Sequence, residues 1–229
     1  MDLNYFIKLM KILLDGTKVS LRIFAITLIF AIPLGILVSA LSISKNKIIS
    51  KIIKLYILLM RGTPLLLQII CIYFAPYYLF KFSYNRFIAV IIAFTLNYAA
   101  YFGEIFRGGI ESIPKGQWEV AFTLGFTKIK TFFIVILPQA IKRILPSISN
   151  EVITLVRDTS LAQVIGVTEL FAFAQKQANY KFSIIPLLVA GLIYLLISVI
   201  LTYIFNYTER KLEYYSCLLY TSPSPRDTR

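Results

Sequence analysis

Charged and amide side chains stand inside long apolar runs of this chain, where an ionisable group is costly unless it is paired or faces a cavity. Asn97 and Glu104 are seven residues apart, so on a helix they share one face, two turns from each other. Arg157 and Asp158 adjoin in a second apolar run. Residues of these types inside apolar segments predict a binding site for a polar solute.

The stretch "RDTSL", residues 157–161, contains residue types that favour a helix N-terminus. Asp158, Thr159 and Ser160 are all helix-capping types, so we expect a helix break there with a second half-helix starting. The free N–H groups and dipole of such a half-helix receive carboxylates in transporters. The alternative is that Arg157 and Asp158 engage other groups in the bundle and hold the break in shape.

A second candidate site is the stretch "RGTPLLLQ". Arg61 begins it, Pro64 removes a backbone hydrogen bond, and Gln68 follows one turn later. These residues predict either contact with a ligand or a packing kink near the membrane surface, and the pattern alone favours neither.

The elements that carry these residues are expected to be membrane-spanning helices. The chain has 229 residues, is 58% hydrophobic, contains no histidine and has a mean hydropathy of +0.76, which is typical of a membrane protein. About 20 mostly apolar residues cross a bilayer. We therefore expect an all-α membrane protein of one domain, with five spans near residues 23–41, 62–80, 87–103, 144–166 and 182–208.

Both ends of the chain differ from this pattern. Residues 1–16 carry apolar side chains at helical spacing opposite charged ones, which predicts an amphipathic helix at the membrane interface that ends at Gly16. Residues 17–213 form the transmembrane domain. Residues 214–229 turn to Ser, Thr, Pro and Arg, typical of a non-native extension or a disordered tail. Cys71 and Cys217 do not suggest a disulfide framework.

The formal charge of +13 is distributed unevenly between the connections, so nucleic acid is not the expected partner. More Lys and Arg fall in the first and third connections and after the last span than on the other side of the membrane. Basic residues favour the cytoplasmic side. We therefore expect the N-terminus outside and the C-terminus in the cytoplasm, with lipid around the aromatic-rich spans.

The segment "GQWEVAFTLGFTKIKTFFIVILP", residues 116–138, is polar for its position between two spans. It predicts two short helices joined by a turn at Gly125. Small residues at Ala121 and Gly125 would let a partner approach closely, and Glu119 could fix the register by a charged contact. By composition alone, an interfacial amphipathic loop is the favoured interpretation.

The pattern E-x-A-x3-G resembles the EAA loop of ABC-importer permeases, with Val120 in place of an alanine and Val135 in place of an isoleucine. Three further stretches, "RGTPLLLQ", "NYAAYFGEIFRGGIESIPKGQWE" and "LPQAIKRILPSISNE", occur in the family's order, followed by "RDTSLAQVIGVTEL". Together they are similar to the polar amino-acid permeases, which take up histidine, glutamine, glutamate, arginine or cystine. The similarity extends from Gly16 to Glu213.

This resemblance implies the type I importer permease fold, with cytoplasmic coupling helices inside a loop of about residues 107–143. It implies a permease of the bacterial cell membrane that works with a dimer of ATP-binding subunits, a second permease chain, identical or not, and an extracytoplasmic solute-binding protein. ATP and Mg would be bound by the ATPase, with no cofactor or metal in this chain. The residues expected to couple to the ATPase are Gln117, Glu119, Ala121, Gly125, Leu137 and Pro138.

For an amino-acid substrate, Arg157 or the half-helix would receive the α-carboxylate, and Glu104 or Asp158 the ammonium or a cationic side chain. The two carboxylates, Glu104 and Asp158, together favour a neutral or cationic substrate over glutamate. The expected substrate-binding residues are Asn97, Glu104, Arg157, Asp158, Ser160, Arg61 and Gln68. Two other classes stay open: a secondary carrier or channel without an ATPase, and a membrane enzyme. The enzyme is disfavoured because no metal-ligand cluster or nucleotide-binding loop is present.

Overall fold

The computed structural model describes residues 3–83 and 85–213, and every element in those ranges is helical. The elements are α1 (Leu3–Ser42), α2 (Lys47–Gly62), α3 (Leu65–Phe80), α4 (Arg86–Glu111), α5 (Lys115–Thr123), α6 (Lys128–Thr131), the π-helix η1 (Phe132–Ile136), α7 (Leu137–Asp158), the 3₁₀ helix η2 (Thr159–Ile165), α8 (Leu170–Lys181) and α9 (Ile185–Glu213). Four stretches of these helices are long and apolar enough to span a membrane, and the bent pair α2–α3 gives a fifth. This agrees with the expected all-α protein with about five spans.

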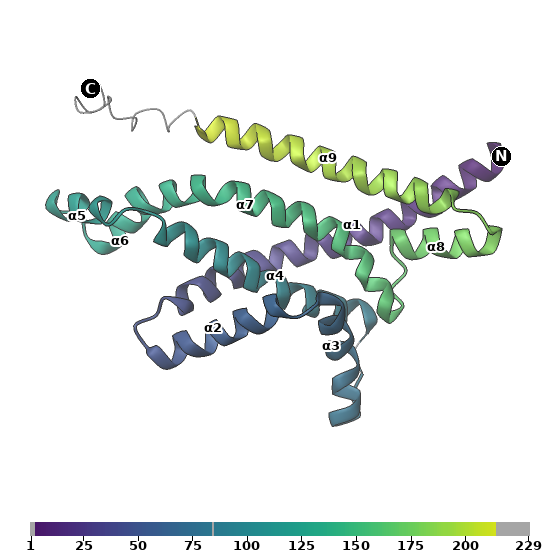
Figure 1. Cartoon of the computed structure of the whole chain (residues 1–229), viewed down its shortest axis with the longest axis horizontal. Helices are drawn as coiled ribbons and strands as arrows, with labels where there is room; N and C mark the ends of the chain where they lie inside the picture. The colour runs from purple at the N-terminus through teal and green to yellow at the C-terminus, as the bar shows by residue number, and fades with distance from the viewer. Residues whose placement is uncertain (1–2, 84, 214–229) are drawn as a thin grey trace, which may run out of the picture.

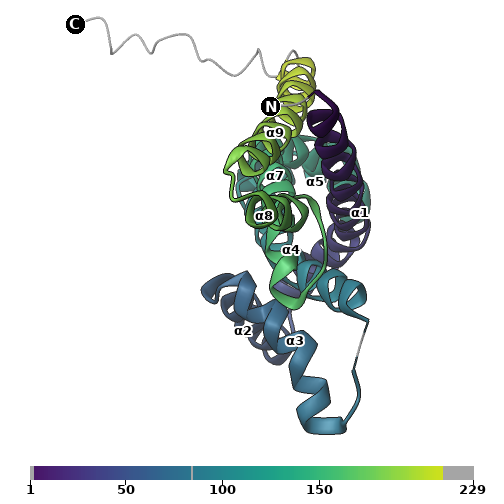
Figure 2. The same ribbon diagram turned by 90° about the vertical axis from the view of Figure 1, so that its right-hand side faces the viewer.

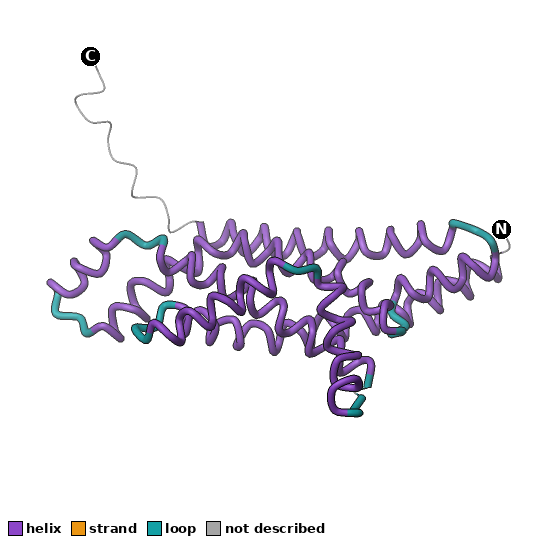
Figure 3. The backbone as a smooth tube through the Cα atoms, turned by 60° about the horizontal axis from the view of Figure 1, so that its bottom comes forward, coloured by secondary structure: helices purple, strands orange, loops and turns teal. Residues whose placement is uncertain are grey.

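The long helices lie side by side along the molecule (Figure 1). Helices α5 and α6 lie at one end, whereas α8 and the start of α1 lie at the other (Figures 1 and 3). The end of α9 lies toward the α5–α6 end. Helices α2 and α3 form an edge of the molecule away from α9 (Figure 2).

Helix α4 is the central span because both its apolar and its aromatic side chains are enclosed by other helices. In the most apolar 18-residue stretch of α4, 56% of the residues are buried, compared with 6% in that of α9. Helix α9 therefore lies at the periphery. Phe94, Tyr98 and Phe102 stack along α4 with ring centroids 6.3 and 6.2 Å apart, and all three are buried. These rings form the middle of the largest apolar cluster.

Helices α1 and α4 pack backbone against backbone. A Cβ atom added to Gly35 would lie 2.8 Å from Phe102 Cβ and 3.2 Å from the amide nitrogen of Gly103. Ala99 and Ala100 are fully buried beside them. Small residues allow such approach between membrane helices, where dispersion and backbone contacts replace the hydrophobic effect. Ala99, Ala100 and Gly103 therefore lie at a tight contact between α1 and α4.

The expected helix end at Gly16 is wrong, because α1 continues without a break from Leu3 to Ser42. Leu9 and Leu13 are buried against Leu170 of α8 and the beginning of α9. A Cβ at Gly16 would lie 2.8 Å from the Cα of Leu170, so this glycine permits close packing and does not stop a helix. At about 1.5 Å per residue, α1 exceeds the thickness of the hydrocarbon layer. The interfacial location of its first turns stays a prediction.

A buried carboxylate fixes α8 to α1 and α9. Glu169 has no exposed surface and accepts hydrogen bonds from the N–H groups of Phe171 and Ala172 at 2.8 Å. Its Oε2 also accepts from Tyr194 Oη at 2.8 Å and Ser20 Oγ at 3.3 Å. Four donors and the helix N-terminus together satisfy the buried charge. The sequence analysis did not single out this residue.

The first connection differs from the expected loop. Most of this connection, with Lys47, Lys51 and Lys54, belongs to α2. Asn46 caps this helix by accepting hydrogen bonds from the N–H groups of Ile48 and Ile49. The chain then turns by 109° between α2 and α3. The second span is therefore a bent pair. The expected tail at 214–229, with Cys217, lies outside the described residues.

We expect Gly35→Val to destabilise the protein, because the new side chain would collide with the backbone of α4 and not with a flexible side chain. Overpacking of this kind costs about 1–3 kcal/mol, or about 3–10 °C in unfolding temperature. Thermal unfolding of the purified protein in detergent measures it. The control is Gly191→Val on α9, where an added Cβ meets nothing within 4 Å. Equal shifts in the two variants would contradict the close packing.

Candidate functional site

The bend between α2 and α3 leaves one backbone carbonyl without its helical donor. Pro64 has no N–H group, so the carbonyl of Met60, four residues earlier, receives no hydrogen bond from it. Two side-chain amides take its place: Gln68 Nε2 donates to Met60 O at 2.9 Å and Asn97 Nδ2 at 3.0 Å. An unsatisfied carbonyl in the membrane interior would cost several kcal/mol.

The same two amides connect the bend to α4. Asn97 Nδ2 also donates to Gln68 Oε1 at 2.9 Å. Gln68 Nε2 lies 3.1 Å from the carbonyl of Thr63 and 2.8 Å from its hydroxyl. Both amides are buried and already bonded. Of the two predicted site residues, Asn97 borders a cavity and Gln68 does not. Gln68 therefore maintains the kink, the alternative that the sequence left open.

A polar cavity of about 510 Å³ lies between this bend, α4 and α7. Its polar and charged walls are contributed by three elements and comprise Arg61, Thr63, Asn97, Tyr98, Tyr101, Glu151, Thr154 and Asp158. Tyr98 Oη donates to Asp158 Oδ2 at 2.7 Å and so orients that carboxylate. No described Lys or Arg nitrogen lies within 4 Å of either Glu151 or Asp158. This cavity therefore presents two carboxylates and one guanidinium, that of Arg61, which attracts Glu151 electrostatically but lies more than 4 Å from both acids.

A second cavity of about 560 Å³ adjoins the first and shares Arg61, Gly62 and Tyr101 with it. The Arg61 guanidinium lies over the Tyr101 ring, 5.2 Å from its centroid, and 3.8 Å from Glu104 Oε1. Glu104 also pairs with Arg107, whose Nε donates a hydrogen bond to Glu104 Oε2 at 3.1 Å. Two guanidinium groups thus neutralise Glu104, unlike the carboxylates of α7.

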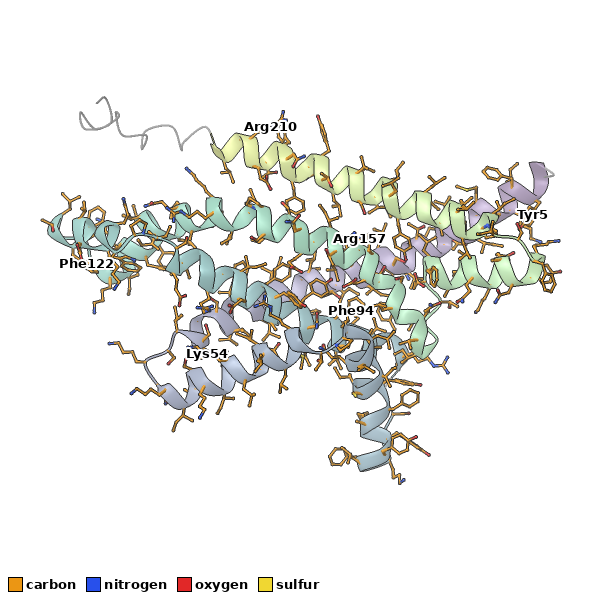
Figure 4. The ribbon with its side chains drawn as sticks, viewed as in Figure 1. Tyr5, Lys54, Phe94, Phe122, Arg157 and Arg210 are labelled. Atoms are coloured by element: carbon orange, nitrogen blue, oxygen red, sulfur yellow. The ribbon has the colours of Figure 1, made fainter. Side chains whose placement is uncertain are left out.

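Two predicted site residues point elsewhere. Arg157 is exposed on α7 (Figure 4) and donates to Thr154 Oγ1 at 3.1 Å. Ser160 Oγ donates to the carbonyl of Arg157 at 2.8 Å. Neither residue borders the described cavities. Asp158 alone of this trio lines the cavity.

The expected half-helix with free N–H groups is also wrong at this point. Helix α7 does end at Asp158, but a tighter 3₁₀ helix continues directly from Thr159. The N–H of Thr159 is bonded to carbonyls of α7, and Asp158 makes no cap. No helix N-terminus opens there to receive a carboxylate.

The sequence analysis did not include Glu151 among the expected site residues. Glu151, Thr154 and Asp158 are spaced by three and four residues, so they share one face of α7. This is the same seven-residue signal that linked Asn97 with Glu104. This spacing could have identified Glu151 from the sequence, but the prediction used the adjacent pair Arg157–Asp158 instead.

The predicted pair of short helices is present at the end of the molecule farthest from α8, as α5 and α6 (Figure 1). Gly125 joins them with a φ of 79°, a left-handed conformation that glycine adopts without strain. The N–H of Phe126 donates to Ala121 O at 3.0 Å and that of Gly125 to Phe122 O at 2.9 Å. This is the Schellman arrangement that ends a helix.

The reason given for Ala121 is wrong, because this residue is 2% exposed and packs inside the hairpin. Glu119 is exposed, and its carboxylate forms no ion pair within the described residues. The apolar residues exposed around it are Val120, Phe122, Leu124 and Ile129. We call these five residues the hairpin surface.

The base of the hairpin is joined to α7 through a π-helical turn. Gln139 Nε2 donates to Gln117 Oε1 at 3.3 Å and to the carbonyl of Val135 at 2.8 Å. The N–H of Leu137 reaches back to Phe132 O, and Pro138 stands exposed in the first turn of α7. The second hairpin helix thus leads through η1 into a span, as a coupling element requires.

A family described as "Binding-protein-dependent transport system inner membrane component" matches residues 31–214. The chain belongs to this family. The permease is 38% identical over 215 residues to the arginine transport system permease protein ArtQ of Bacillus subtilis (strain 168), covering 93% of this chain and 98% of that protein. It is 37% identical over 206 residues to the L-cystine transport system permease protein TcyB of the same organism, covering 89% and 88%. With the putative glutamine transport system permease protein GlnP of Rickettsia bellii (strain RML369-C), identity is 36% over 204 residues, or 87% and 92%.

Solved structures give the same result. The permease resembles a chain of the "Crystal structure of an amino acid ABC transporter with histidines", with a TM-score of 0.85, 29% identity, and 92% and 99% of the two chains covered. A chain of the MetNI methionine ABC transporter in an inward-facing conformation gives a TM-score of 0.70 at 14% identity, with 93% and 99% covered, which shows the fold alone.

The permease is therefore the non-catalytic, inner-membrane subunit of an ABC importer for polar amino acids. It works with ATPase subunits, which bind the ATP, and with a binding protein. The expected family, fold and role as a transport subunit are confirmed, and a secondary carrier, a channel or a membrane enzyme is excluded. Within the described residues, no group of three or more His, Cys, Asp or Glu is placed to hold a metal ion.

We expect Gln68→Leu to destabilise the permease by about 1–3 kcal/mol, because Thr63 O loses its amide donor and Asn97 loses one acceptor. Thermal unfolding in detergent measures this effect. The matched control is Gln175→Leu, at an exposed position of α8. If both variants unfold at the same temperature, the amide pair does not hold the bend.

Proposed function

We propose that the permease translocates an amino acid with a cationic side chain, and that Glu151 and Asp158 hold the positive charge of this substrate. The observation that carries the proposal is the pair of carboxylates on one face of α7, in a cavity where no described basic group lies within 4 Å of either. Arg61, the basic residue that lines the same cavity, balances at most one of these two charges. An isolated charge buried away from water is costly, so a cationic ligand is the complement that this cavity favours. ArtQ of Bacillus subtilis, named for arginine transport, supports the same class.

The α-carboxylate of the substrate is assigned to Arg61. This guanidinium borders both cavities, is stacked over Tyr101, and lies 3.8 Å from Glu104, farther than the 2.5 Å of the shortest Arg107 contact. It can therefore turn from Glu104 to a substrate while Arg107 continues to neutralise Glu104. Arginine forms strong bidentate pairs with carboxylates.

We expect Glu151→Gln and Asp158→Asn each to lower arginine uptake by about 10-fold or more, since each removes a charge-assisted contact worth about 1.5–3 kcal/mol. Uptake of labelled arginine is measured in proteoliposomes that contain the permease, its ATPase subunits and the binding protein. Retention of the ATPase subunits on the purified variants shows that assembly is intact.

The matched control for these variants is Asp15→Asn, a carboxylate bonded to Lys18 and outside the cavity. It should leave uptake unchanged. Wild-type uptake in both carboxylate variants, or a preference for glutamate, would place the substrate site elsewhere.

We further propose that the hairpin surface binds an ATPase subunit of the dimer in the cytoplasm, and that a second permease chain, identical or not, completes the pathway. Exposed apolar side chains around the unpaired Glu119 suit a partner groove that carries a basic group. The binding protein would then meet the opposite end, where α8 lies.

The positions of the chain ends support the orientation that the basic residues predict. The end of α9 lies toward α5 and α6, whereas the start of α1 lies at the α8 end (Figures 1 and 3). With the hairpin in the cytoplasm, the N-terminus is outside and the C-terminus inside.

Cysteine labelling tests this orientation. In a permease that lacks Cys71 and Cys217, we expect a membrane-impermeant maleimide to label Tyr180→Cys in right-side-out vesicles, and Glu119→Cys only in inside-out ones. Both positions are exposed and lie on α8 and α5. Labelling of Glu119→Cys from the outside would reverse the proposed topology.

A further inference from the structure

Helix α2 presents three different faces to its surroundings. One face is buried and packs Ile57, with Ile53, Tyr56 and Met60, against α1 and α4. A second face carries Lys47, Lys51 and Lys54 at the i, i+4 and i+7 positions of one helical stripe, and all three lysines are exposed. The third face is apolar.

The lysine stripe borders an open hollow of about 330 Å³ that it shares with Ser44 and Ser50. No carboxylate of the described residues lies within 4 Å of the three ammonium groups. Glu104, the acid that attracts Lys54 electrostatically, is already paired with Arg107. The hollow therefore holds three positive charges that form no ion pair with any described carboxylate.

One of the two serine hydroxyl groups at this hollow can also donate a hydrogen bond to a ligand. Ser44 Oγ accepts from the N–H of Asn46 at 3.3 Å, which leaves its own hydrogen free to donate. Ser50 Oγ is committed to the carbonyl of Ser42 at 2.6 Å. Asn46 already caps the first N–H groups of α2, so the lysines, and not the helix end, would attract an anion.

The apolar face lies directly beside the lysine stripe. Ile48, Ile52 and Leu55 are 71%, 60% and 55% exposed. Each of them follows a lysine by one residue, a rotation of about 100° around the helix. Exposed apolar side chains next to a basic stripe are typical of helices at the headgroup boundary of a membrane.

We propose that this hollow binds the headgroup of an anionic phospholipid, with the acyl chains along Ile48, Ile52 and Leu55. The N-terminal part of α2 lies toward the end of the molecule that carries α5 and α6 (Figure 1). Lys54 of this helix is labelled in Figure 4. Basic hollows beside spans at a membrane surface attract anionic lipids by charge complementarity. The adjoining apolar face favours a lipid over a free phosphate or an acidic protein.

Native mass spectrometry of the detergent-purified transporter, with its ATPase subunits, tests this site. The complex is titrated with phosphatidylglycerol or with phosphatidylcholine of the same acyl chains. We expect stronger retention of phosphatidylglycerol, decreasing with ionic strength. Lys47→Gln/Lys51→Gln/Lys54→Gln should weaken this retention by about 10-fold or more, because each lysine near a membrane surface contributes several-fold. The corresponding triple Arg variant should retain the lipid.

The charge-matched control is Lys81→Gln/Lys176→Gln/Lys181→Gln, which removes three exposed lysines outside the hollow. An equal loss in this control, or equal retention of the two lipids by the wild type, would overturn the proposal. So would binding of free glycerol phosphate as tight as that of the lipid. Loss of the ATPase subunits with lipid retention unchanged would mean that an acidic protein surface occupies the stripe.

Discussion

The carbonyl of Met60 is the group on which the polar interior of this permease depends. Pro64 deprives it of a helical donor, and within a membrane such a group must find another. Gln68 and Asn97 supply two donors and in doing so fix the bend of α2–α3 against α4. The bend places Arg61 over Tyr101, between the two cavities. A broken helix and its satisfied carbonyl thus create the space in which a solute can be held.

Around this bend, the rigid contacts and the exposed surfaces occupy different parts of the molecule. Close packing at Gly35 and the buried Glu169 clamp join α1 to α4, α8 and α9. The α5–α6 hairpin, in contrast, is attached at its base to α7 through a π-helical turn and exposes apolar side chains at its surface. The second helix of the hairpin is therefore connected without a loop to α7, the helix that carries Glu151 and Asp158.

Charge follows the same division. Near the hairpin end, Glu104 is held between Arg61 and Arg107, and the lysines of α2 lie unpaired at the surface. Beside the bend, the carboxylates of α7 form no ion pair within the described residues, and Arg61 is the basic residue that lines their cavity. This distribution supports our proposal that a cation binds beside the bend, because two carboxylates and one guanidinium line the cavity there. Neither carboxylate is held in an ion pair within the described residues.

The sequence by itself determined the membrane class, the number of spans, the two short helices around Gly125 and the family, because these depend on apolar run length, on a glycine conformation and on motif order. It also placed Asn97, Glu104 and Asp158 among the polar residues inside spans. Only the tertiary structure decided which of them share a cavity: Gln68 is used in the bend, Arg157 points outward, and Glu151 faces Asp158's cavity. Periodicity fixes residues to one face of a helix, but which neighbour that face meets depends on packing between helices far apart in sequence. Gly16 shows the same limit, since its role was set by the Cα of Leu170 and not by its own helix.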